Sequence, residues 1–243
     1  MTFAYTPAQQ SVQDRARAAA DRHVRPAAQA IDAGGRIPDA VTTALAAEAL
    51  WPAPDAVSAL VVVEEIAAAS PAVAASIALA GAVAGDAGLP GLRGFASAAG
   101  GSVSAEARVA VAGLALGIGR AALEEAIGVL KNAGARPKGS EQTPHWVLAD
   151  AATEIDGARL LALKAAQTIG RGQAADAEAA MAQSFANLAA QKAVEAALRI
   201  LGPEGYRQGT VLERLTRDQR AASLLTGTEE EPRAVAAAGT LPQ

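Results

Sequence analysis

Three long stretches with helical character in the second half of the chain constrain its fold more than any other feature. They cover about residues 105–132, 144–170 and 174–201 and are rich in alanine, whose side chain has no rotamer entropy to lose in a helix. Each stretch is longer than an ordinary globular helix. Since long antiparallel helices usually pack side by side, we expect a helical bundle here.

The first part of the chain is also predicted to be helical. Thr6 suits the N-cap of a first helix that runs to about His23 or Val24, and Pro7 suits its first position. Val61-Val62-Val63 could form a strand, but the following Glu64-Glu65 and alanines favour a helix. Four further helices are expected, over about residues 26–33, 38–50, 57–69 and 71–84.

A change in composition separates the two parts. The 20 residues from 85 to 104 are rich in Gly, Ser and Ala, with one Pro, and lack helical or strand periodicity, which is typical of a linker. The predicted domains are therefore residues 1–84 and 105–243, joined by the linker 85–104. Beyond the three long helices, a helix over 211–225 is followed by an interruption at 228–232 and a last frayed turn over 233–238.

Charge and composition exclude several classes of protein. A net charge of -4 with scattered basic residues argues against nucleic-acid or anionic-membrane binding. Cysteine is absent, so thiol chemistry and disulfides are excluded. The N-terminus lacks the apolar core of a signal peptide, and the alanine-rich stretches carry charges or glycine within the length of a membrane span. We expect a cytoplasmic protein without a membrane segment.

The candidate sites visible from residue types alone are weak. His23 and His145 have no second ligand at metal-binding spacing, so no metal site is expected. Gly117-x-Gly119-x-x-Ala122 matches a dinucleotide-binding turn superficially, but no second strand with a terminal acidic residue follows. Close packing of helices around small residues is the favoured interpretation of these glycines.

Four ordered segments carry a resemblance to a known family. They are Gln9 to Leu50, then Val63-Glu64-Glu65-Ile66-Ala67 through Ala74, then Arg108 to Ala126 with Leu148 to Lys164, and finally Ile200-Leu201-Gly202-Pro203-Glu204-Gly205-Tyr206 with Glu213 to Asp218 and Gly227-Thr228. Together they resemble the acyl-CoA dehydrogenases. The resemblance implies an all-α chain, with an N-terminal helical domain and a C-terminal four-helix bundle.

The chain departs from the family pattern at two decisive places. Family members carry a β-domain between the helical parts, which holds the flavin and the acyl thioester, and here the linker occupies its place. Their catalytic glutamate stands directly before the Gly-Thr that matches Gly227-Thr228, where this chain has Thr226. In some members it stands before the arginine that matches Arg108, where this chain has Ala107. A threonine hydroxyl cannot remove an α-proton near neutral pH.

Flavin contacts implied by the resemblance survive in part. The positions that would contact the nucleotide end of FAD are Lys131, Gln142, Gly202, Gly205 and Thr228. Some family members reach the flavin of a neighbouring subunit with such residues. An equally weighted alternative is that these positions have only structural roles.

Three functions remain open at this stage. The first is an acyl-CoA dehydrogenase-like subunit that is not catalytic alone and completes the FAD and acyl-CoA site of a full-length partner. The second is a non-enzymatic scaffold that pairs with itself as a dimer or tetramer. The third is an acyl-CoA-binding protein without FAD, in which Glu106, Arg108 or Glu229 would contact the ligand; Arg108 is the substrate-binding candidate.

Overall fold

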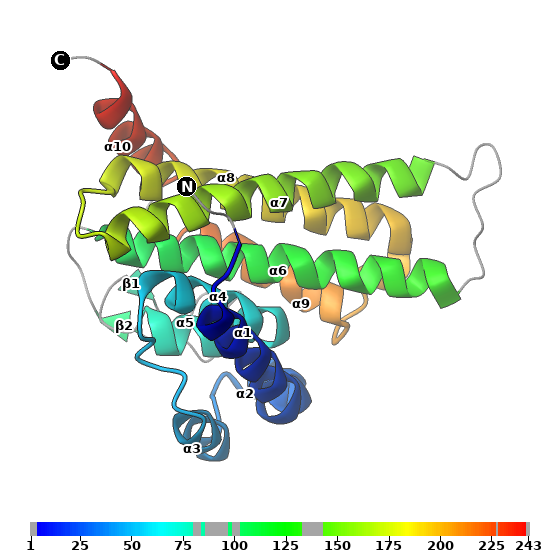
Figure 1. Ribbon diagram of the computed structural model, residues 1–243. Coiled ribbons are helices and arrows are strands. Elements are labelled where there is room, and N and C mark those ends of the chain that lie inside the picture. The colour runs from blue at the N-terminus through cyan, green and yellow to red at the C-terminus, as the bar shows by residue number, and fades with distance from the viewer. Residues whose placement is uncertain are drawn as a thin grey trace.

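A computed structural model describes residues 4–79, 84–85, 97–98, 103–132, 143–226 and 228–241. The helices of the first part are α1 (Pro7–Ala19), α2 (Ala28–Gly34), α3 (Asp39–Ala47), α4 (Ala56–Ala69) and α5 (Pro71–Ala78). Those of the second part are α6 (Ala105–Asn132), α7 (Thr143–Gly170), α8 (Asp176–Leu201), α9 (Val211–Ser223) and α10 (Glu230–Thr240) (Figure 1). The all-α prediction is confirmed.

Local sequence signals explain the ends of the first helices. The Thr6 hydroxyl accepts a hydrogen bond from the Gln9 amide, and the Gln9 side chain accepts one from the Thr6 amide, so a capping box begins α1. One π-helical turn (Ala20–Val24) and one 3-10 turn (Arg25–Ala27) connect α1 to α2. Gly35 ends α2 at a φ of 63°, a left-handed conformation that glycine adopts without steric cost.

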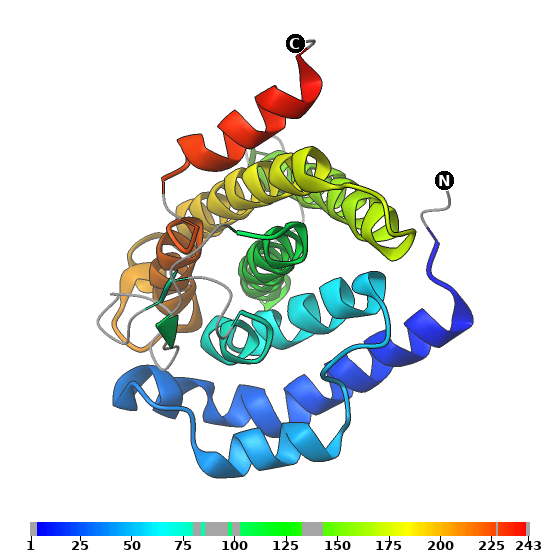
Figure 2. The same cartoon turned by 90° about the vertical axis from the view of Figure 1, so that its left-hand side faces the viewer.

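Helix α6 is the centre of the structure. It packs against α4, α7, α8 and α9, and Figure 2 shows it nearly end-on with the other helices around it. Most of its residues from Ala107 to Ala126 are buried, which explains why its sequence is apolar on nearly all sides. Helices α6, α7, α8 and α9 form the predicted four-helix bundle.

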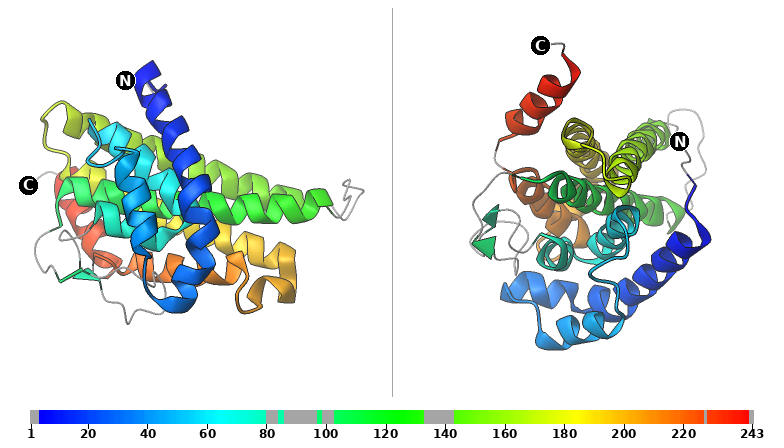
Figure 3. Two further views of the ribbon diagram at one scale, coloured as in Figure 1. Left: turned by 90° about the horizontal axis from the view of Figure 1, so that it is seen from below. Right: turned by 60° about the vertical axis from the view of Figure 1, so that its left-hand side comes forward.

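The first part of the chain forms two layers on this bundle. Helices α4 and α5 lie directly against α6, and α1 packs on α4 from the outside (Figure 3). Buried side chains from both parts belong to one continuous hydrophobic core. The domain boundaries at residues 84 and 105 stay a prediction.

Three glycines of α6 are needed for this close packing. A Cβ at Gly117 would lie 2.5 Å from the carbonyl oxygen of Glu64 and 2.6 Å from Cβ of Ala67, both on α4. A Cβ at Gly119 would collide with Ile155 of α7, and one at Gly113 would press on Leu60. Because Gly117 and Gly119 lie inside a continuous helix, the dinucleotide-binding interpretation is wrong and helix packing is confirmed.

Two element predictions need correction. The predicted helix over 71–84 ends at Ala78, and Ala84–Gly85 instead form β1, which pairs antiparallel with β2 (Ser97–Ala98). The predicted last turn is a full helix, α10, which begins before Pro232. Proline is tolerated there because the first-turn amides of a helix have no intrahelical acceptor. None of the described helices is both long and apolar enough to cross a membrane.

Candidate functional site

The two positions that would carry a catalytic carboxylate lie at the same end of the bundle. Ala107 is on the first turn of α6, and Thr226 lies between α9 and α10; both are buried. Arg108 follows Ala107 and is only 3% exposed. Helix α8 contributes Gln183, which is 1% exposed. The fold therefore gathers these polar groups from three separate segments into one buried place.

Hydrogen bonds connect these residues in a row. The amide Nε2 of Gln183 donates to Oγ1 of Thr226 at 2.6 Å, and Nη1 of Arg108 donates to Oε1 of Gln183 at 3.0 Å. On its other side, Nη2 of Arg108 lies 3.5 Å from Oε1 of Glu231 on α10. The Thr226 hydroxyl is thus engaged with a neutral amide. We call Arg108, Gln183, Thr226 and Glu231 the Arg108 cluster.

An apolar cavity of about 180 Å³ lies on the other side of Ala107. Its walls come from α4, α5, α6 and the end of α7, and include Trp51, Leu60, Val109 and Ile169. Glu106 is the carboxylate among its lining residues, and it is exposed. This cavity could accept a short apolar group, with a single acidic side chain at its edge.

The predicted cofactor positions do not come together. Lys131 ends α6, and Gly202 and Gly205 follow the end of α8, so all three lie at the far end of the bundle from Thr228. Along α6, the distance from Arg108 to Lys131 is about 35 Å at the usual helical rise. One dinucleotide cannot contact both ends. Gln142 lies outside the described residues.

Local structure accounts for both predicted glycines. Gly202 has a φ of 60° where the chain leaves α8, a conformation that favours glycine. A Cβ at Gly205 would lie 3.1 Å from side-chain atoms of Leu201 and Leu212. Lys131 and Thr228 are exposed. Local backbone conformation and packing thus explain why glycine stands at positions 202 and 205. Neither of these explains why lysine stands at position 131.

A second charged cluster joins the two parts of the chain, and sequence reasoning did not find it. Glu64 and Glu65 of α4 are 4% and 2% exposed. Arg159 of α7 binds both carboxylate oxygens of Glu64, while Arg17 of α1 and Arg120 of α6 bind Glu65. Burial by itself would raise the pKa of Glu65, but the hydrogen bonds from Arg17 and the charge of Arg120 outweigh it and lower that pKa.

No metal centre is visible in the described part of the chain. There, no three histidine, aspartate or glutamate side chains come together as a metal site would require. His23 contacts Glu48, with Nε2 at 3.2 Å from Oε1.

The overall arrangement defines a helical protein of a recognisable class. It superimposes on butyryl-CoA dehydrogenase from Megasphaera elsdenii with a TM-score of 0.85 and 17% identity, with 100% of each chain covered. It also matches a glutaryl-coenzyme A dehydrogenase with a TM-score of 0.75 and 18% identity, over 98% of this chain and 96% of that chain. These likenesses establish the fold.

Sequence comparison gives the family. The model of the acyl-CoA dehydrogenase C-terminal domain matches residues 93–241. One similar protein is 3-(aryl)acrylate reductase of Clostridium sporogenes, which is 38% identical over 55% of this chain and 36% of its own length. Another is an acyl-CoA dehydrogenase of Bacillus subtilis, which is 39% identical over 53% of this chain and 34% of its own length. The chain belongs to the acyl-CoA dehydrogenase family, and the resemblance predicted from its motifs is confirmed. It spans about a third of the length of these relatives.

Proposed function

We propose that this chain is an acyl-CoA dehydrogenase-like subunit that is not catalytic alone and completes the FAD and acyl-CoA site of a full-length partner. The observation that carries the proposal is the Arg108 cluster. Both positions assigned to the family's base are filled by buried residues without a carboxylate, and the hydroxyl of Thr226 is bound by Gln183. Neither of these two positions therefore carries a group that could take an α-proton at neutral pH.

The separation of the predicted cofactor positions supports a shared site. Residues at opposite ends of a bundle about 35 Å apart would contact different flavins. At one of these ends the candidate contact is Lys131, an exposed cation on the last turn of α6. A lysine in that position can bind a pyrophosphate as a point charge. Thr228 would contact a flavin at the other end.

Co-expression with a full-length acyl-CoA dehydrogenase from the same source tests the proposal. The mass in solution and the visible absorbance of oxidised flavin are measured for each chain alone and for the pair. We expect a complex of both chains that contains flavin, and no dehydrogenation of acyl-CoA by this chain alone. Absence of a complex would refute the proposal, and so would dehydrogenase activity of the chain alone.

A charge reversal makes the test specific. Lys131→Glu should lower the flavin content of the complex, whereas Arg36→Glu, an exposed cation on the segment before α3, should leave it unchanged. Equal flavin content in both variants would show that Lys131 does not contact the cofactor. The mass of the complex shows in the same experiment whether either variant prevents assembly.

The apolar cavity beside Ala107 favours a second candidate function, acyl-CoA binding without FAD. Its lining is mostly alanine, leucine, valine and isoleucine, and its volume of about 180 Å³ suits a short acyl group. Calorimetric titration of the isolated chain with butyryl-CoA tests this candidate. Binding that Ala110→Trp abolishes would support it, and heats equal to those of coenzyme A alone would refute it.

A further inference from the structure

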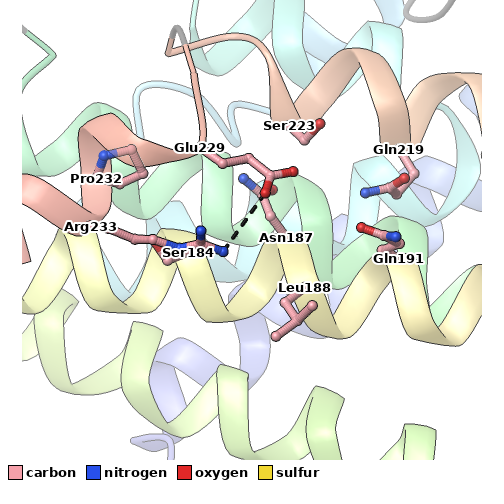
Figure 4. Close-up of a pocket in the computed structure, with 9 residues that line it drawn as sticks. All are labelled: Ser184, Asn187, Leu188, Gln191, Gln219, Ser223, Glu229, Pro232 and Arg233. Carbon is pink, nitrogen blue, oxygen red and sulfur yellow. Dashed lines mark ion pairs between the residues drawn. The ribbon is translucent and has the colours of Figure 1, made fainter.

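Helix α10 covers a surface of the bundle that carries several polar groups. It packs on α8, yet Pro232 is its one buried residue. Beneath it lies a cavity of about 30 Å³ whose lining includes the polar Ser184, Asn187, Gln191, Gln219 and Ser223 and the apolar Leu188 (Figure 4). The buried Oγ of Ser184 has no hydrogen-bond partner among the described residues. Because only Pro232 of α10 is fully buried, its own side chains add little to the hydrophobic core.

Two contacts fix α10 at its ends. Near its start, the carboxylate of Glu231 lies 3.5 Å from Nη2 of Arg108. Near its end, Gly239 approaches Ala177 so closely that a Cβ would collide with the alanine side chain. The side chain of Glu231 is 45% exposed, whereas that of Arg108 is 4% exposed. A nearly buried guanidinium is therefore reached from solvent through the place that Glu231 occupies.

The groups around that place match a carboxylate. An arginine guanidinium offers paired donors to two oxygens, and such charge-assisted bonds are the strong ones. Gln183 and Thr226 hold the guanidinium from behind by way of the Gln183 amide. A buried cation left without an anion is costly, so the site requires an occupant. In this structure the occupant is a side chain of the same molecule.

We propose that Arg108, Gln183 and Thr226 form a binding site for small organic carboxylates, that Glu231 is its intramolecular occupant, and that α10 is its removable cover. The ligand would bind to Arg108 in place of the Glu231 carboxylate. Its class is a carboxylate of two or three carbons, because the Glu231 side chain beyond Cβ is itself an acetate unit. This proposal does not depend on a partner subunit.

Chemical rescue of Glu231→Ala tests it. The substitution removes a CH2–COO⁻ group, which acetate can replace. We expect the variant to unfold about 2–4 °C below the wild type. Sodium acetate should restore most of this loss with saturation, whereas sodium chloride at equal ionic strength should not. Glu230→Ala is the matched control, because its carboxylate is on the same turn and contacts Thr228 instead of Arg108.

Each other result overturns the proposal. Equal shifts with acetate and chloride would show ordinary screening, and the same acetate effect in Glu230→Ala or in the wild type would show binding elsewhere. Phosphate as effective as acetate would overturn the carboxylate assignment. Amide hydrogen exchange of α10 checks the cover: it should be faster in Glu231→Ala than in the wild type, and unchanged exchange would show that the Arg108 contact does not hold α10.

Discussion

Arg159 binds Glu64 with both ends of its guanidinium, although the two residues are 95 positions apart. Nη2 of Arg159 lies 2.8 Å from Oε1 of Glu64, and Nε lies 3.2 Å from Oε2. The pair connects α7 of the bundle to α4 of the first part. It therefore adds a buried ion pair to the hydrophobic core that the two parts share.

Removal of this arginine should be strongly destabilising. Arg159→Met leaves the buried Glu64 carboxylate with Arg120 alone, at 3.6 Å, and such a loss typically costs about 3 kcal/mol of unfolding free energy. Arg36→Ala removes an exposed pair with Asp39 and should change it by less than about 0.5 kcal/mol. Urea unfolding at neutral pH measures both. Similar values for the two variants would contradict a structural role for the Arg159–Glu64 pair.

The neighbouring Glu65 should make stability depend on acidic pH. Its folded-state pKa lies below the ordinary value near 4.5, so between those two values the unfolded chain binds more protons. The stabilisation is complete above the ordinary pKa and is lost as the pH falls through the folded-state pKa. We expect the unfolding free energy of the wild type to decrease from pH 5 to pH 3, and that of Glu65→Gln to decrease less steeply.

Urea unfolding across this pH range provides the measurement. Glu213, whose pKa is lowered by its hydrogen bond from Arg217, contributes to the slope in both proteins and therefore cancels in the comparison. Parallel curves for the wild type and Glu65→Gln would show that Glu65 does not contribute. The prediction concerns the slope, because the substitution also changes the stability at neutral pH.

A methyl group at Gly117 should separate two helices. Gly117→Ala forces α6 away from the α4 backbone and should cost about 1–3 kcal/mol. Gly128→Ala lies on the same helix with no other atoms within 4 Å of the new Cβ, so it should gain about 0.5–1 kcal/mol from helix propensity. Thermal unfolding distinguishes the two. A gain in both would mean that α6 and α4 are not in close contact.

The hydroxyl of Thr226 should matter for folding. Thr226→Val removes the acceptor for the Gln183 amide and leaves a buried donor unpaired, at a cost of about 1–3 kcal/mol. Thr153→Val is the matched control, because its hydroxyl is exposed and donates to its own helix, and it should lie within about 0.5 kcal/mol of the wild type. Equal effects would show that the Thr226 hydrogen bond is dispensable.

Local signals were sufficient to predict much of this fold. Alanine content and length predicted the bounds of α6. The hydroxyl of Thr6 caps α1, Pro7 stands at its first position, and Gly35 ends α2, so these ends depend on residues close in the sequence. The prediction that the helix continues beyond Ala78 was wrong. Alanine favours a helix wherever it occurs, whereas the true end of α5 depends on the rest of the structure. The full α10 was missed because Pro232 was taken as a helix breaker.

The buried polar groups could not be predicted in the same way. Glu64 and Glu65 are adjacent acidic residues in one helix, and their three arginine partners come from other helices. Gln183 stands among buried alanines of α8, and this lone polar residue on an apolar face was the one available signal. The role of Gln183 depends on its hydrogen bonds with Arg108 and Thr226, and these residues lie beside it only in the folded chain.

The pairing of β1 with β2 has a consequence for how this family can change. Ala84 lies opposite Ala98, so two points of the connection between α5 and α6 lie side by side. Adjacent strands are about 4.8 Å apart, and a connection whose ends are that close can be lengthened or shortened without moving the helices. A whole folded domain can therefore be inserted or removed between α5 and α6, because the two ends of the insertion lie close together.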